Sequence, residues 1–252
     1  MSEPFTVNEL TLQVDVRPAD WVVAAVRDFS DNTVGCLVPP VFAAYARVFH
    51  PARRTVDGTE EEVSWMQVTR ATGRTAHPAM QWPFITGSWR FRSADGQPGI
   101  WDDPPEEGSL PMRQTVRLAQ LLAAHTATPE QCWFAVWEGF GDLNLPVESE
   151  IPRVEMPARP MLLLAGPVGA ATTSFAATPW RDQRASLWWP QDRAWCVATD
   201  VDLMTTYVGG SEECVATLVA DGELEVMEID SDQRLAWDSD LVNPVPPDRD
   251  GH

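Results

Sequence analysis

The hydrophobic and polar positions along this chain of 252 residues predict strands and helices in an irregular order. Residues 10–16 alternate between apolar and polar side chains, which is the period of a strand with one solvated face. Further strands are predicted over 132–141, 151–156, 161–165 and 223–229. Helices are predicted over 20–29, 41–50, 111–125 and 211–221. This order predicts an α+β fold, with a mixed, largely antiparallel sheet and helices packed on it.

The segment 41–50 has its apolar residues at helical spacing, and Pro51 follows, which predicts a helix that ends at His50. Tyr45, Arg47 and His50 then lie near its C-terminus, where a cation is favoured by the exposed carbonyl groups. Two interpretations of His50 stay open. It interacts with those carbonyls, or it has a role in ligand binding or acid–base chemistry.

The stretch 185–211, ASLWWPQDRAWCVATDVDLMTTYVGGS, predicts the hairpin around which the chain is organised. Residues 185–189 and 194–199 are rich in Trp, Val and Thr, and the proline and polar residues of 190–193 favour a turn between them. Both faces of the second strand are apolar or small, which predicts a central position in the sheet. A glycine pair precedes Ser211, a good N-cap for the following helix.

The same stretch supports two interpretations. In the first, it is a core hairpin with solvated aspartates and glycines that let the chain turn. In the second, it is a binding site in which Trp188 or Trp189 forms aromatic walls and Arg193 supplies a cation. Asp200 and Asp202 would add carboxylates to that site. The start of the next helix could accept an anion, but two glutamates in its first turn argue against a phosphate.

The domain organisation is predicted from the distribution of proline and glycine. Residues 71–111 hold many of the chain's breakers, which predicts short elements carrying three tryptophans, or a partly mobile lid. We expect one α+β domain over 1–237, with a boundary between subdomains within 71–111 if there is one. Residues 238–252 are predicted to be a polar C-terminal tail.

The net charge and the tryptophan content indicate which kinds of partner or ligand suit this chain. The formal net charge is −19, and the chain contains 12 tryptophans. An acidic surface repels phosphate backbones, so we expect no direct binding of nucleic acid, whereas a basic protein partner suits it. The tryptophans indicate either packed aromatic clusters or platforms for a small molecule.

Motifs for common chemistry are missing from the sequence. The four histidines share no metal-ligand spacing, and the chain has no P-loop, GxGxxG or GxSxG motif, so we expect no metal and no cofactor. Asp200-x-Asp202 could hold Mg²⁺, but the motif is too short to be specific. Four widely spaced cysteines, no apparent signal peptide and no apolar run long enough for a bilayer predict a cytoplasmic protein without membrane segments.

Three pieces of the sequence resemble a family of acidic, tryptophan-rich bacterial proteins, to which no function is assigned. They are YARVFHP (45–51), CWFAVWEGFG (132–141) and LWWPQDRAWCVATDVDLMTTYVGGS (187–211). The resemblance covers most of the chain and implies no reaction, substrate or cofactor. It implies that two sets of residues belong together: Tyr45, Arg47 and His50, with Trp189, Arg193, Asp200 and Asp202.

Two hypotheses for function follow. The first is a non-catalytic interaction or regulatory module, of which an immunity protein is one kind, whose acidic surface meets a basic partner. The second is a small-ligand-binding protein or enzyme, with tryptophans stacking the ligand and Arg193, Asp200 and Asp202 fixing its polar groups. A concave tryptophan-lined pocket containing those carboxylates would favour the second hypothesis. A flat acidic face over buried tryptophans would favour the first, to which the sequence inclines.

Overall fold

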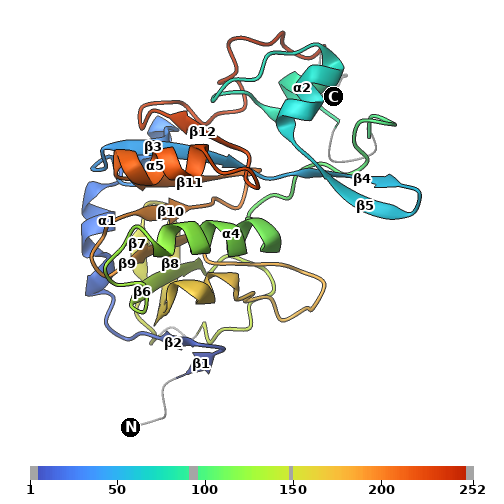
Figure 1. The fold of residues 1–252 in the computed structure, drawn as a ribbon. Helices are drawn as coiled ribbons and strands as arrows, with labels where there is room; N and C mark the ends of the chain where they lie inside the picture. Colours follow the sequence, from blue (N-terminus) through green and yellow to red (C-terminus); the bar gives the residue numbers. More distant parts are fainter. Residues whose placement is uncertain (1–4, 91–95, 148–149, 248–252) are drawn as a thin grey trace.

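The computed structural model describes residues 5–90, 96–147 and 150–247. Within them, ten strands form one sheet whose pairings are antiparallel (Figure 1). In spatial order the strands are β1 (Thr6–Val7), β2 (Leu10–Leu12), β8 (Arg159–Gly166), β6 (Cys132–Trp137), β9 (Leu187–Pro190), β10 (Cys196–Ala198), β11 (Thr205–Gly210), β3 (Ala44–Phe49) and β12 (Val226–Ile229), with β7 (Val154–Met156) also paired to β8. The predicted α+β class with a largely antiparallel sheet is confirmed.

The β9–β10 hairpin forms where the sequence predicts it. Val197 pairs with Trp188, and the turn between the strands ends at Arg193, whose φ is 58°. Trp195 and Val197 face one apolar cluster, whereas Cys196 faces the other. The two strands lie in the middle of the sheet, as the apolar character of both faces predicts.

The predicted helix over 41–50 is wrong, because this segment is the strand β3. β3 is paired on both sides: Val48 lies opposite Thr206 of β11 and opposite Val226 of β12. All six of its residues are buried, so apolar side chains occur on both faces and the alternation of a one-sided strand is absent. A short apolar run of this kind is equally compatible with a helix, and only pairing with neighbouring strands determines that it forms a strand. His50 therefore does not lie at a helix C-terminus.

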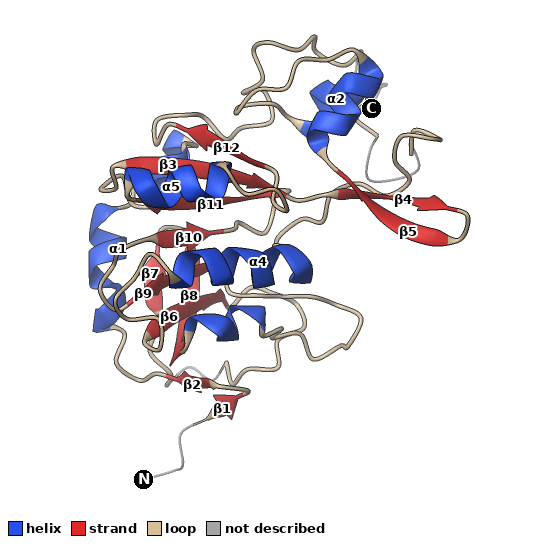
Figure 2. Cartoon of the chain, viewed as in Figure 1, coloured by secondary structure: helices blue, strands red, loops and turns tan. Residues whose placement is uncertain are grey.

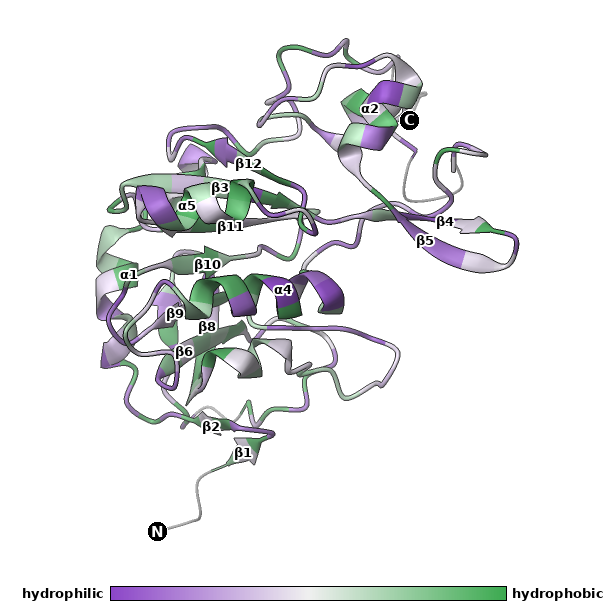
Figure 3. Ribbon diagram, in the orientation of Figure 1, coloured by the Kyte–Doolittle hydropathy of each residue, from purple (hydrophilic) through white to green (hydrophobic). Residues whose placement is uncertain are grey.

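Helices cover both faces of the sheet (Figures 1 and 2). On one face α4 (Met112–Ala123), α5 (Glu212–Val219) and the 3₁₀ turn Val168–Thr172 enclose the largest apolar cluster. α1 (Asp20–Ala25) packs on the other face. Figure 3 shows hydrophobic residues along the strands between these helices. The predicted helices over 111–125 and 211–221 are confirmed with slightly shorter bounds.

The N-cap of α5 follows the sequence closely. Ser211 Oγ accepts a hydrogen bond of 3.1 Å from the backbone N–H of Cys214, which satisfies one of the donors that a helix start leaves free. Gly210 and Gly209 belong to β11 and not to a loop. A Cβ on Gly209 would lie 2.5 Å from Phe42 Cδ2, so a close approach of the chain explains this glycine.

A second, smaller region is built at the end of β3. It contains the hairpin of β4 (Ala52–Val56) and β5 (Thr59–Val63), then α2 (Trp65–Thr72) and α3 (Trp82–Thr86). Its centre is a chain of rings: Phe49, Trp65, Trp82 and Trp101 follow one another at centroid distances of 5.0, 5.1 and 5.3 Å. The turn between β4 and β5 lies at Asp57-Gly58, a residue pair typical of hairpin turns, with positive φ at both residues.

The C-terminal segment packs against this smaller region. Its residues 248–252 lie outside the described part of the chain. Asp240 and Asn243, from the predicted polar tail, are buried. Asn243 accepts from the N–H of Thr75 at 2.8 Å and donates to the Thr75 carbonyl at 3.0 Å, while Asp240 contacts His77 Nε2 at 2.8 Å. These contacts attach residues 239–243 to the loop between α2 and α3.

Candidate ligand-binding site

Two hollows in the molecule share the loop 199–204, which connects β10 to β11. Thr199, Asp200 and Val201 line the first, and Asp202, Leu203 and Met204 line the second. The predicted carboxylates are therefore divided between two places. The two hollows differ in size and in the state of the arginine that each contains.

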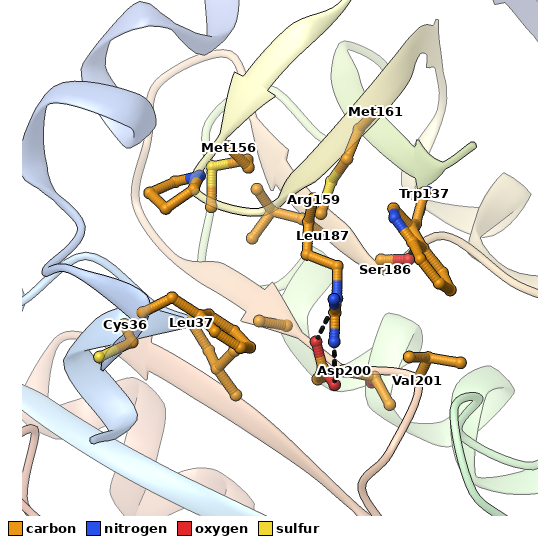
Figure 4. Close-up of a pocket in the computed structure, with 14 residues that line it drawn as sticks. Cys36, Leu37, Trp137, Met156, Arg159, Met161, Ser186, Leu187, Asp200 and Val201 are labelled. Atoms are coloured by element: carbon orange, nitrogen blue, oxygen red, sulfur yellow. Dashed lines mark hydrogen bonds and ion pairs between the residues drawn. The ribbon is translucent and has the colours of Figure 1, made fainter. Parts of the chain in front are cut away.

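The first hollow is narrow and closed by an ion pair (Figure 4). Arg159 Nε lies 3.1 Å from Asp200 Oδ2, and Arg159 Nη2 lies 3.4 Å from Asp202 Oδ2. The guanidinium also lies over the rings of Trp137 and Phe29, at 4.9 and 5.1 Å from their centroids. The remaining space is about 30 Å³, room for a water molecule but not for an organic ligand.

The second hollow, which we call the tryptophan cavity, has a volume of about 260 Å³. A cavity of roughly 150 Å³ already accommodates benzene, so there is space for a small organic molecule. Aromatic side chains make up much of its wall: Trp65, Trp82, Trp89, Trp237 and Tyr207. Trp65, Trp82 and Tyr207 are buried, whereas Trp89 is half-buried and Trp237 is exposed. The cavity thus has a deep aromatic part and an open aromatic rim.

Arg47 of β3 lines the deep part of the tryptophan cavity and is only 3% exposed. Its Nη1 donates to the carbonyl oxygens of Pro78 and Met80, at 2.7 and 2.9 Å. Its guanidinium carbon lies 4.7 Å from the ring centroid of Phe49 and 5.5 Å from that of Trp65. Among the described residues it forms no ion pair. Burial lowers the pKa of Arg47, because the charged form has lost its water.

Two donors that line this cavity have no hydrogen-bond partner in the described part of the chain. They are Arg47 Nε and Trp82 Nε1, and both atoms are buried. Other tryptophans of the same region are satisfied: Trp65 Nε1 donates to the His50 carbonyl at 2.8 Å, and Trp101 Nε1 donates to Gln97 Oε1 at 2.9 Å. A buried donor without an acceptor is unfavourable by about 1–3 kcal/mol. Both atoms lie behind the surface of the cavity wall, and unpartnered buried atoms also occur elsewhere, at Trp21 Nε1 and Arg184 Nε among the described residues.

Carboxylates lie at the rim. Asp202 has a side chain that is 74% exposed, and Glu107 is exposed as well. Their segments are joined by a hydrogen bond of 3.0 Å from Gly108 N to Leu203 O. Gly108 has φ of +82°, and a Cβ there would lie 3.0 Å from Val201 O, so only glycine fits this approach. The site has donors inside and negative charge outside.

The C-terminal segment forms the outer wall of the tryptophan cavity. The ring of Trp237 meets the edge of Trp89 at a centroid distance of 5.3 Å, and Trp89 Nε1 donates to the Pro246 carbonyl at 3.3 Å. Gln81 Nε2 donates to Ser239 Oγ at 2.8 Å. The cavity therefore exists only because residues far apart in sequence are held together by this segment.

The residues that the sequence singles out are dispersed by the fold. Trp188 and Trp189 are buried on opposite faces of β9: Trp188 meets the edge of Trp195 at 5.2 Å, and Trp189 meets Trp21 at 6.2 Å. Arg193 is exposed and lies 5.3 Å over the ring of Trp21. None of these three predicted residues lines the tryptophan cavity.

Tyr45 and His50 have structural partners instead. Tyr45 Oη accepts from the N–H of Phe42 and donates to the Pro39 carbonyl, each at 3.0 Å. His50 is fully buried, its Nδ1 donating to the Glu106 carbonyl at 2.7 Å and its Nε2 lying 2.9 Å from Thr206 Oγ1. Burial lowers the pKa of His50 to about 4, so at neutral pH the ring is uncharged.

Of the predicted site residues, Arg47 and Asp202 line the tryptophan cavity. Sequence reasoning missed Arg159, which binds both aspartates, and also missed the four tryptophans and Tyr207 of the cavity wall. Tryptophan abundance was the only signal of the wall in the sequence. It could not select these tryptophans from the remainder.

The chemistry that the cavity offers is binding. Among its lining residues no nucleophile is paired with a base, and the one hydroxyl pair is Thr205 Oγ1 donating to Tyr207 Oη at 3.2 Å. In the described residues no group of three or more His, Cys, Asp or Glu side chains is arranged to hold a metal ion. No helix in the described ranges has the length and apolar character that crossing a membrane requires.

Comparison with known proteins gives no further guide to the site. No protein family, no curated protein and no solved structure matches this chain.

Proposed function

We propose that this protein binds a small planar molecule in the tryptophan cavity. The observation that carries the proposal is an aromatic-walled cavity of about 260 Å³ whose lining includes a buried cation, Arg47, that forms no ion pair in the described residues. Small-ligand sites are mostly apolar with a few polar groups that fix orientation, and this cavity has that composition. It is concave and tryptophan-lined, and of the two carboxylates in the ligand hypothesis it contains Asp202, whereas Asp200 lines the other hollow.

The polarity of the cavity defines the ligand class. The inner end is lined by the buried cation Arg47, so the inner end of the ligand carries an acceptor such as a carboxylate or a carbonyl oxygen. The tryptophan walls suit a flat ring, which they contact by stacking or edge-to-face. Asp202 at the rim, which is 74% exposed and also faces Arg159 Nη2 at 3.4 Å, favours an amino group at the outer end. The ligand is thus a short planar molecule with an acceptor at one end and a cation at the other.

A reducing cytoplasm is the compartment that we propose for this activity. Cys36, Cys132, Cys196 and Cys214 are free and buried. Burial raises the pKa of Cys132 to about 12 and that of Cys214 to about 11, so these thiols behave as small apolar side chains.

A non-catalytic interaction or regulatory module remains a second proposal. The net charge of −19 favours a basic protein partner, and an immunity protein is one module of this kind. The sheet edge at β12 is a surface on which such a partner can bind. The two proposals use different surfaces, so each can fail without the other.

The ligand proposal is tested with three molecules that share one ring. The probes are 4-(aminomethyl)benzoate, which has both end groups, 4-methylbenzoate and 4-methylbenzylamine. Binding is followed through the indole N–H signals in ¹⁵N NMR spectra, with the Trp82 signal identified by its loss in Trp82→Phe. We expect the two-ended probe to shift this signal and to bind about tenfold tighter than either one-ended probe.

Matched variants distinguish binding in the tryptophan cavity from nonspecific binding of the probes. Trp82→Phe removes an N–H that has no partner in the chain, so the fold is retained while binding weakens. Asp202→Asn should weaken the two probes with an amine and leave 4-methylbenzoate unchanged. Trp101→Phe, outside the cavity, serves as the control. The proposal is refuted if no probe shifts the Trp82 signal, or if Trp82→Phe and Trp101→Phe bind equally well.

A further inference from the structure

The strand β12 ends the sheet, and one of its edges is open. The N–H of Phe49 donates to the Glu225 carbonyl at 2.9 Å, which fixes the hydrogen-bonding side of this strand. Along an antiparallel strand the backbone N–H and C=O groups of successive residues point alternately to one edge and to the other. Val226 and Glu228 therefore turn these groups away from β3. Among the described residues these groups form no hydrogen bond. Figure 1 shows β12 at the upper edge of the stack of strands.

A groove of about 600 Å³ lies at the C-terminal end of this open edge. Glu228 and Ile229 of β12 and the following Asp230 form one wall. The C-terminal segment at Ser239, Leu241 and Val242 and the loop residues 77–79 form most of the rest. Leu241 is 90% exposed and Val242 is 58% exposed, although both are apolar. The groove therefore combines unpaired backbone groups on one side with exposed apolar side chains on the other.

The charge at the groove is negative. Glu228 and Asp230 are exposed, and within the described part of the chain neither forms an ion pair. The basic side chains nearby are already engaged: His77 with Asp240, and Arg234 with Asp238. An occupant of this groove meets uncompensated carboxylates.

We propose that the groove beside β12 binds an extended, basic segment of another protein as an additional strand. Backbone hydrogen bonds to Val226 and Glu228 would supply affinity that does not depend on sequence. Lysine or arginine side chains would meet Glu228 and Asp230, and apolar side chains would cover Leu241 and Val242. This inference is independent of ligand binding in the tryptophan cavity.

Charge selects this occupant over a second copy of the same chain. Pairing two β12 edges would bring Glu228 and Asp230 of each copy together, and like charges across a strand pair are unfavourable. Exposed charge on an edge strand also hinders pairing between identical molecules. A basic segment converts the same residues into attractive contacts.

The test uses a peptide of roughly eight residues that alternates lysine and valine, with blocked ends. Its controls are the matching glutamate–valine peptide and a lysine–valine peptide N-methylated at every residue, which has no backbone N–H to donate on either edge. We expect the lysine–valine peptide to bind the full chain and to slow hydrogen exchange at the Val226 and Glu228 amides. Both controls should bind at least about tenfold more weakly.

Two variants complete the test. Glu228→Pro removes an N–H that points away from β3, so the ladder with β3 is retained and peptide affinity should fall about tenfold or more. Glu228→Gln keeps the N–H and removes only the charge, so affinity should fall roughly two- to fivefold, and less at high salt. No binding, equal binding of the glutamate–valine peptide, or unchanged exchange at Val226 and Glu228 would each overturn the proposal. A dimer seen by sedimentation and broken by Glu228→Pro would assign the edge to a second copy.

Discussion

Arg159 and Arg47 have similar aromatic surroundings but differ in their charge partners and in the size of the hollow beside them. Both guanidinium groups lie over two or more aromatic rings and beside a hollow. Arg159 reaches Asp200 and Asp202, and its hollow is closed to about 30 Å³. Arg47 has two backbone carbonyls and no ion pair in the described residues, with Asp240 and Glu225 acting on its charge from farther away, and its cavity remains about 260 Å³.

The difference separates a structural site from a binding site. A buried charge is tolerated when a counter-charge and hydrogen bonds replace its water, which is the situation of Arg159. At Arg47 the rings and carbonyls replace only part of that hydration, and Nε stays without a partner. The charge of Arg159 is thus compensated within the chain, whereas the charge of Arg47 is left for a ligand to compensate. A buried cation without an ion pair beside an open cavity is a better guide to a ligand than the number of aspartates.

The largest expected effect comes from the aromatic support of Arg47. Trp65→Ala removes a fully buried ring that contacts Arg47, Phe49 and Trp82. We expect the free energy of unfolding to fall by about 3–5 kcal/mol in urea denaturation, together with loss of ligand binding. Trp237→Ala at the 59% exposed rim is the control, since it should weaken binding with little loss of stability. Equal losses of stability in the two variants would contradict the division of the cavity wall into a buried inner part at Trp65 and an exposed rim at Trp237.

A second effect compares the buried neutral ring of His50 with the buried cation Arg47, three residues earlier in the chain. The pKa of His50 is lowered from 6.5 to about 4, first by burial and then by the positive charges of Arg47 and Arg184, against the hydrogen bond to the Glu106 carbonyl. The unfolded chain therefore takes up a proton before the folded one. This contribution to stability is complete above pH 6.5 and is lost as the pH falls towards 4.

This contribution of His50 to the free energy of unfolding is roughly 3 kcal/mol. It is measured as the difference between the urea unfolding curves of the wild type and His50→Gln at several pH values, since other groups titrate equally in both proteins. The wild type should lose stability more steeply than the variant between pH 6.5 and 4. Parallel curves would mean that His50 is not held neutral by the fold.

A third variant makes Arg159 resemble Arg47. Asp200→Ala removes the main counter-charge of Arg159, although Asp202 remains within 3.4 Å. Because the Arg159 side chain is 20% exposed, we expect a loss of about 1–2 kcal/mol in the free energy of unfolding, below that of a fully buried pair. Arg159→Met combined with Asp200→Ala should recover part of the loss. A double variant that is no more stable than Asp200→Ala would place the effect in the loop 199–204 and not in the charge.

The smallest effect separates stability from binding. Ser211→Ala removes the N-cap of α5, on the sheet side of the molecule, and should lower the free energy of unfolding by about 1 kcal/mol. The affinity of the tryptophan cavity for 4-(aminomethyl)benzoate should stay unchanged, as judged by the Trp82 indole signal. A change in that affinity would couple the two regions and weaken the contrast between them.

The sequence by itself determined the features that depend on near neighbours. The class of the fold, the helices near 111–125 and 211–221, the β9–β10 hairpin and the turn at Asp57-Gly58 all follow from periodicity, caps and turn residues within a short window. Ser211 is the clearest case, because the group that it satisfies lies three residues away.

Only the tertiary structure decided what lies beside Arg47. The segment 44–49 is a strand because β11 and β12 pair with it, and no local pattern states which side chains will face it. The cavity wall brings Trp65, Trp82, Trp89 and Trp237 together across most of the chain length. Arg159 joins Asp200 across 41 positions of sequence. Charge compensation acts through space, so the sequence could identify candidate residues, whereas only the fold could show which of them lacked a partner.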